Sequence, residues 1–127
     1  MDKEISVIIF ERNVGSDLIR TINTVNNAAK SVPDLFYEII VVDDGSGDST
    51  SSIVRTYAEK NVRLLQLSDE VGGKKLALTK GIEIASHPLI VTTDADCIYP
   101  NNWLNTLLSY RAEQDAVFVA APVKYAK

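Results

Sequence analysis

The sequence contains few of the residues that most often identify a particular chemistry. Its 127 residues include one cysteine, one histidine and one tryptophan. A single cysteine, Cys97, cannot form a disulfide within the chain, so we expect a reducing compartment and a cytoplasmic protein. The only histidine, His87, precedes Pro88 and is interpreted as a surface residue, which excludes catalytic triads built on histidine.

Long apolar runs and concentrated charge are also absent. No run approaches the roughly 18 apolar residues of a membrane span, and the charged start of the chain does not resemble a signal peptide. The net charge is −4 and the basic residues are scattered, which argues against nucleic acid as a partner because nucleic-acid binders carry a basic stripe. Hydrophobic residues make up 46% of the chain, which suits one domain with a single core.

Apolar runs and helical patterns alternate along the chain. The apolar runs predict strands at residues 5–10, 37–42, 62–67, 89–94 and 116–121. Apolar residues at helical spacing predict helices at about residues 17–30, 49–60, 74–85 and from 100 onward. Because the strands are apolar along most of their length, both of their faces are expected to be covered. The pattern predicts an α/β fold of three layers (αβα), in which a mostly parallel sheet lies between helices.

Polar residues follow the ends of four predicted strands. The loops contain Glu11-Arg12-Asn13, Asp43-Asp44-Gly45-Ser46, Gly72-Gly73-Lys74-Lys75 and Asp94-Ala95-Asp96. Because the carboxyl ends of parallel strands meet at one edge of a sheet, these loops are expected to converge on one cleft. An isolated Asp-Xaa-Asp is usually a solvated turn, so the prediction of a binding site rests on the convergence of all four loops.

The residue types in these loops indicate a metal and a phosphate. Asp94 and Asp96 offer hard oxygen ligands, which suit Mg²⁺ or Mn²⁺ sharing a substrate phosphate. Gly73 and Lys74 stand at the start of a predicted helix, where backbone N–H groups and a positive charge favour an anion. The segment is not a Walker A loop, because Lys75 stands where serine or threonine is needed. A dinucleotide fingerprint is also disfavoured, because Thr50 replaces its third glycine.

In this order, the motifs resemble those of the N-terminal half of a family 2 glycosyltransferase with the Rossmann-like GT-A fold. The resemblance covers essentially the whole chain and is carried by residues 5–9, 37–46, 73–78, 80–81, 94–96 and 103–104. It implies that the chain binds a nucleotide-diphosphate sugar, with a UDP-type donor favoured. It further implies a parent enzyme that transfers the sugar to an acceptor hydroxyl in polysaccharide or cell-envelope synthesis, with Mn²⁺ or Mg²⁺ as cofactor.

The resemblance also assigns roles to residues. Asp43 and Asp44 would contact the uracil or ribose, and Lys74 would lie near the base or the phosphates. Asp94 would meet the ribose or the metal, and Asp96 the metal that bridges the diphosphate. The expected nucleotide-binding set is completed by Phe10, Arg12 and Gly73. Phe10 stands where the family usually has proline, and the loop from Glu11 onward only partly matches the family.

The family continues beyond the matching region with an acceptor-binding half that carries the catalytic base. We therefore expect residues 1–127 to be the donor-binding part of a larger domain. The parent protein is expected to associate with the cytoplasmic face of a membrane. Such a part should bind a UDP-type ligand with metal but should not transfer sugar alone. Apolar surface that the other half would cover predicts self-association of this part, with pairing through the strand edge near residues 116–123.

Three other classes stay open at this point. One is a non-catalytic nucleotide-binding module, and a second is a nucleotidyltransferase. The third is a receiver-type phosphoacceptor domain, although its acidic pair should follow the first strand and here follows the second. Titration with a UDP-sugar, a nucleoside triphosphate or an acyl phosphate distinguishes these classes.

Overall fold

The central feature of the fold is a four-stranded parallel sheet. The computed structural model describes residues 4–11, 16–43, 61–67, 73–94, 97–98, 100–114 and 124–125. The strands of this sheet are β1 (Glu4–Glu11), β2 (Phe36–Asp43), β3 (Val62–Gln66) and β4 (Leu89–Asp94). They lie in the order β3-β2-β1-β4, and all three neighbouring pairs are parallel. The predicted parallel α/β sheet is therefore confirmed.

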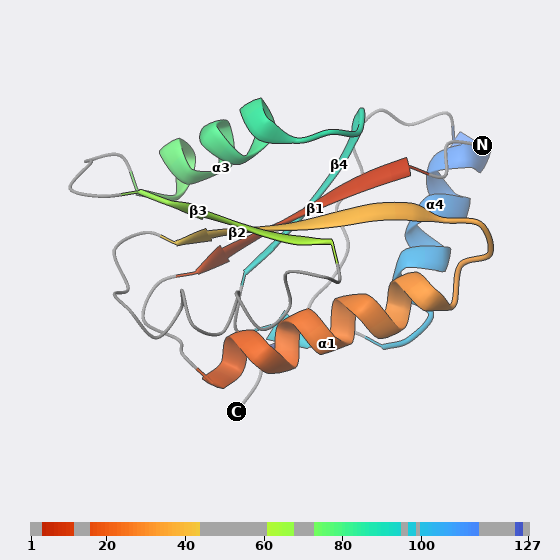
Figure 1. The fold of residues 1–127 in the computed structure, drawn as a ribbon. Coiled ribbons are helices and arrows are strands. Elements are labelled where there is room, and N and C mark those ends of the chain that lie inside the picture. The colour runs from red at the N-terminus through yellow and green to blue at the C-terminus, as the bar shows by residue number, and fades with distance from the viewer. Residues whose placement is uncertain are drawn as a thin grey trace.

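Helices cover both faces of the sheet, as Figure 1 shows for α1 and α3. The described helices are α1 (Ser16–Lys30), α3 (Gly73–Ile84) and α4 (Trp103–Gln114). Ile5, Val7 and Ile9 of β1 belong to the same apolar cluster as α1 and α4. Ile8, between them in the sequence, belongs to a second cluster with α3. Because successive side chains of a strand point to opposite faces, covering both faces requires an uninterrupted apolar strand.

The helix α1 is held to the sheet by one apolar stripe. Leu18, Ile22 and Val25 have no exposed surface, and Ala29 is 2% exposed. This is the stripe that the helical spacing predicts. Burying one large aliphatic side chain contributes roughly 1.5–3 kcal/mol, so the stripe accounts for the position of the helix. None of the described helices has both the length and the apolar character that a membrane crossing requires.

On the other face, α3 approaches the sheet most closely at Gly81. A Cβ atom at this position would lie 3.0 Å from Cγ2 of Ile8 and 3.3 Å from Cγ2 of Val42. Both distances are shorter than an ordinary van der Waals contact, so a side chain here would push against two strands. A glycine inside a helix costs up to about 1 kcal/mol relative to alanine, and here it permits close packing.

The end of the chain differs from the prediction. No strand was predicted between residue 94 and the helix expected from residue 100 onward, but Cys97–Ile98 form β5, which pairs antiparallel with β6 (Lys124–Tyr125). The helix α4 begins at Trp103 rather than in a first turn containing Pro100. The amide of Thr106 donates to the carbonyl of Asn102 (2.9 Å), so Asn102 occupies the N-cap position. The helix predicted at 49–60 and the strand predicted at 116–121 lie outside the described residues.

Candidate functional site

The four parallel strands end together at one edge of the sheet. Glu11, the last residue of β1, is in register with Asp43, the last residue of β2. Asp43 is also in register with Gln66 at the end of β3, and Phe10 is in register with Asp94 at the end of β4. Neighbouring strands lie about 4.8 Å apart, so the register brings these residues to one short edge. We call it the carboxyl edge.

Two of the acidic residues at the carboxyl edge are buried. Asp43 is 2% exposed and Glu11 has no exposed surface. The carbonyl of Asp43 accepts a hydrogen bond from the amide of Leu67 (2.9 Å), which is the residue directly after β3. This bond holds the end of β2 against the end of β3. Both acidic residues interact with other groups of the protein. Burial of polar groups is costly unless they are paired or hydrogen-bonded, which agrees with these interactions.

The first turn of α3 also lies toward the carboxyl edge. The last carbonyl of this helix, that of Ile84, accepts a hydrogen bond from Nη2 of Arg63 near the opposite end of the sheet. A helix of 12 residues spans about 18 Å, so Gly73 begins α3 toward the end where the strands stop. Lys74 follows in the first turn, where the helix dipole favours an anion.

The structure thus brings together the backbone positions of Phe10, Asp43 and Asp94, with Gly73 and Lys74 on the adjacent helix. The remaining predicted site residues, Arg12, Asp44 and Asp96, lie outside the described residues. Within the described ranges, no group of three His, Cys, Asp or Glu side chains lies close enough together to hold a metal ion. Carboxylate oxygens at the end of β4 suit Mn²⁺ or Mg²⁺, and the second carboxylate of the predicted pair is Asp96.

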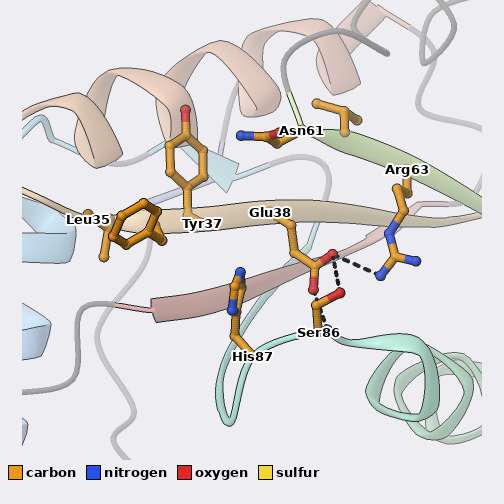
Figure 2. Close-up of a pocket in the computed structure, with 9 residues that line it drawn as sticks. Leu35, Tyr37, Glu38, Asn61, Arg63, Ser86 and His87 are labelled. Atoms are coloured by element: carbon orange, nitrogen blue, oxygen red, sulfur yellow. Dashed lines mark hydrogen bonds and ion pairs between the residues drawn. The ribbon is translucent and has the colours of Figure 1, made fainter.

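A second polar cluster, which the sequence analysis did not single out, lies at the opposite, amino-terminal end of the sheet (Figure 2). Its centre is Glu38 of β2, which is 8% exposed. One carboxylate oxygen, Oε2, accepts from Oγ of Ser6 (2.6 Å) and from the amide of Ser86 (2.5 Å). The other, Oε1, accepts from Nη2 of Arg63 (2.8 Å). We call these four residues the Glu38 network.

The Glu38 network joins segments that are far apart in the sequence. Ser6 lies on β1 and Arg63 on β3, while Ser86 lies in the turn between α3 and β4. The amide of His87 donates to Oγ of Ser6 (3.2 Å), so the same turn is held twice. His87 was predicted to be a surface residue, and the structure shows it half-buried. Its hydrogen bond to Ser6 comes from the backbone amide and not from the imidazole ring. The network fixes the starts of three strands and the end of α3.

Burial and hydrogen bonding act in opposite directions on Glu38. Burial raises the pKa of its carboxyl, but hydrogen bonds from Ser6 and from the Ser86 amide, together with the charge of Arg63, lower the pKa below its ordinary value. Glu38 is therefore ionised at neutral pH. One signal in the sequence could have revealed the pair, since Ser6 and Glu38 are polar residues inside two apolar strands and lie directly opposite each other.

Two surface grooves lined by described residues lie at this amino-terminal end, not at the carboxyl edge. One of about 600 Å³ is lined by residues that include Tyr37, Glu38 and Asn61. The other, about 400 Å³, lies between α1 and the starts of β2 and β3. Neither groove contains a residue of the predicted nucleotide site.

The parallel sheet, its helical layers and the clustering of strand ends define an α/β fold that matches GT-A glycosyltransferase structures. The sequence model of Glycosyl transferase family 2 matches residues 6–127, and the chain belongs to this family. Glycosyltransferase AglE of Haloferax volcanii is 34% identical over 102 residues, which make up 79% of this chain and 33% of that protein. A dolichyl-phosphate beta-glucosyltransferase of Dictyostelium discoideum is 39% identical over 79 residues, 59% of this chain and 24% of that protein.

Solved structures show the same fold. The structure of S. aureus TarS 1–349 in complex with UDP has a TM-score of 0.76 at 25% identity, covering 88% of this chain and 33% of TarS 1–349. The mannosyltransferase PcManGT of Pyrobaculum calidifontis, in complex with GDP-Man and Mn²⁺, has a TM-score of 0.72 at 26% identity, covering 85% and 32%. The chain thus spans about a quarter to a third of the length of these relatives and solved chains.

Proposed function

We propose that residues 1–127 form the donor-binding part of a glycosyltransferase and bind a nucleotide-diphosphate sugar at the carboxyl edge. The observation that carries this proposal is the strand register, which places Phe10, Asp43 and Asp94 at one edge. Membership of Glycosyl transferase family 2 supports it, as do relatives solved with UDP, UDP-GlcNAc, or GDP-Man and Mn²⁺.

Each residue of the proposed site has a defined task. Asp43 and Asp44 accept hydrogen bonds from the base or ribose, which places the nucleotide over the ends of β1 and β2. The first turn of α3, with Gly73 and Lys74, faces the negative charge of the phosphates. Phe10 and Arg12 line the nucleotide from the end of β1 and the loop that follows.

Asp96, together with Asp94, would hold Mn²⁺ or Mg²⁺ against the diphosphate. A bound divalent ion stabilises the negative charge that the leaving nucleotide acquires during sugar transfer. Two carboxylates are too few for a tight site by themselves, so oxygens of the nucleotide complete the coordination. Metal binding and nucleotide binding are therefore expected to depend on each other.

Calorimetric titration of the 127-residue protein tests the site. We expect a UDP-sugar to bind with Mn²⁺ present and to bind at least about tenfold more weakly after chelation, since two or three coordination bonds are lost. Asp96→Asn and Asp94→Asn should remove the metal dependence. Asp34→Asn is the matched control, because Asp34 is an exposed aspartate in the turn before β2, at the other end of the sheet.

The same titration separates the competing functions. Tighter binding of GDP-Man than of any UDP-sugar would contradict the preference for a UDP-type donor. Preference for a nucleoside triphosphate over every nucleotide sugar would support a nucleotidyltransferase. Binding that is equally metal-dependent in Asp96→Asn and in the unmodified protein would contradict the metal assignment.

Sugar transfer requires more than donor binding. An acceptor hydroxyl must lose its proton to a nearby base, which typically contributes 10²–10⁴-fold to the rate. The acceptor must also be held in line with the sugar. We expect the 127-residue protein to bind donor without transferring sugar, and transfer to a defined acceptor that is lost in Asp96→Asn would contradict this expectation.

A further inference from the structure

The two surface grooves at the amino-terminal end of the sheet are neighbours. Tyr37 and Asn61 line both of them, so the lobes of about 600 Å³ and 400 Å³ meet at these two residues. Small-molecule sites usually measure about 300–1,000 Å³, so each lobe is large enough for a ligand. We call the combined feature the amide groove. It lies at the opposite end of the strands from the carboxyl edge.

Asparagine side chains dominate the smaller lobe. Asn23, Asn26 and Asn27 lie on one face of α1, three and four residues apart, and Asn61 faces them from the turn before β3. Each side-chain amide offers two hydrogen-bond donors and one acceptor. Asn26 is 6% exposed, and its Oδ1 accepts from the hydroxyl of Tyr37 (2.7 Å), so its amide is held in one orientation.

The charges around the groove favour a neutral ligand. Glu38 and Arg63 line the larger lobe, but they neutralise each other across 2.8 Å. Lys30 borders the smaller lobe and is exposed. A pair that neutralises itself offers little attraction to a charged ligand, and the charge of exposed Lys30 is screened by water and salt. Burial raises the pKa of Tyr37, so its phenol stays neutral as well.

Aromatic surface borders the same groove. Phe36 is 67% exposed at the rim of the larger lobe, and Tyr37 stands half-buried between the lobes. In Figure 2 the Tyr37 ring rises from β2 toward α1, while Glu38 points to the other side of the strand. Aromatic rings present an apolar face beside polar groups, a combination that suits a ligand with both C–H and hydroxyl surface.

We propose that the amide groove binds a neutral saccharide. Its hydroxyl groups would exchange hydrogen bonds with the asparagine amides, and a C–H face would contact Tyr37, which lines both lobes. This site is separate from the proposed donor site, since it lies at the opposite end of the strands. The proposal therefore does not rest on the proposed function, and either can fail without the other.

Nuclear magnetic resonance titration of the labelled 127-residue protein tests the proposal. The probes are neutral hexasaccharides of glucose and of N-acetylglucosamine, added without nucleotide or metal. We expect shifts confined to α1, the starts of β2 and β3, and the side-chain amides of Asn27 and Asn61. Saturation with UDP and Mn²⁺ should leave these shifts unchanged.

Two variants and a control make the test specific. Asn27→Ala and Asn61→Gly should each weaken binding about fivefold, the ~1 kcal/mol net value of one hydrogen bond. Glycine is chosen at position 61 because the backbone φ there is 62°, which glycine adopts without strain. Asn105→Ala, which removes an exposed asparagine from α4, should leave binding unchanged.

Three results would overturn the proposal. The first is the absence of shifts with every neutral hexasaccharide at millimolar concentration. The second is equal weakening in Asn27→Ala and Asn105→Ala. The third is tighter binding of an acidic hexasaccharide than of the neutral ones, which would contradict the charge argument.

Discussion

At the scale of single residues, Glu38 makes stability depend on pH. Its pKa in the folded protein lies below the ordinary value of 4.5, so the unfolded chain takes up a proton first as the pH falls. The stabilisation is present in full above about pH 4.5 and is lost as the pH drops through the folded-state pKa. We predict that Glu38→Gln flattens the acid side of the stability profile, measured by urea unfolding between pH 7 and pH 3.

The same variant should also be less stable at neutral pH. Glutamine cannot pair with Arg63 and presents only one acceptor oxygen to the donors of Ser6 and Ser86, so we expect a loss of about 1–3 kcal/mol. Glu83→Gln is the matched control, since Glu83 is an exposed glutamate on α3. If both variants kept the pH profile of the unmodified protein, Glu38 would not be the group responsible.

At the scale of elements, the close packing of α3 against the sheet depends on Gly81. A methyl group there would lie 3.0 Å from Ile8 Cγ2, so we predict that Gly81→Ala lowers the free energy of unfolding by about 1–3 kcal/mol through overpacking. This cost should exceed the gain of about 1 kcal/mol in helix propensity. Chemical denaturation measures the change. Thr79→Ala, at an exposed position of the same helix, should show no comparable loss.

The elements themselves were largely predictable from the sequence. The strands β1, β2, β3 and β4 and the helices α1 and α3 lie within one or two residues of their predicted bounds. Each of these elements has an apolar pattern within its own residues, because one face of each helix and both faces of the central strands are buried. Such a pattern can be recognised without knowing the rest of the fold. The strand β5 was missed because two residues form a strand only through a distant partner, Lys124–Tyr125. The start of α4 was misplaced because proline near a helix start does not say which residue is the cap.

At the scale of the whole molecule, ligand binding should raise thermal stability. A ligand at 100 times its Kd stabilises the folded state by about 2.7 kcal/mol, so UDP with Mn²⁺ should raise the Tm by several degrees. At the tenfold weakening expected on chelation, the same concentration is only about 10 times Kd and stabilises by about 1.4 kcal/mol, so chelation should remove about half of the rise. Asp94→Asn should lower the rise to the level seen after chelation and Asp34→Asn should retain the full rise, as measured by differential scanning fluorimetry. An equal rise in all three proteins would place the ligand elsewhere.

The parts of the site were predictable to different degrees. The convergence of Phe10, Asp43 and Asp94 follows from parallel strands alone, because their carboxyl ends share an edge. The roles of Arg12, Asp44 and Asp96 stay predictions. The amide groove could not be predicted from the sequence, because Asn27 of α1 and Asn61 in the turn before β3 line one groove only in the folded chain. Long-range packing of this kind leaves no local pattern.

The central position of β1 has a consequence for how the chain folds. This strand pairs on one side with β2, which follows soon in the sequence, and on the other with β4, beginning at the pair Ile5 and Leu89. During synthesis, one side of β1 can therefore pair early, while the other must wait until residues 89–94 have emerged. Pairings between such distant segments slow folding and leave apolar strand edges open to wrong partners. We expect the edge of β1 that later pairs with β4 to be the point at which a nascent chain is most prone to aggregate.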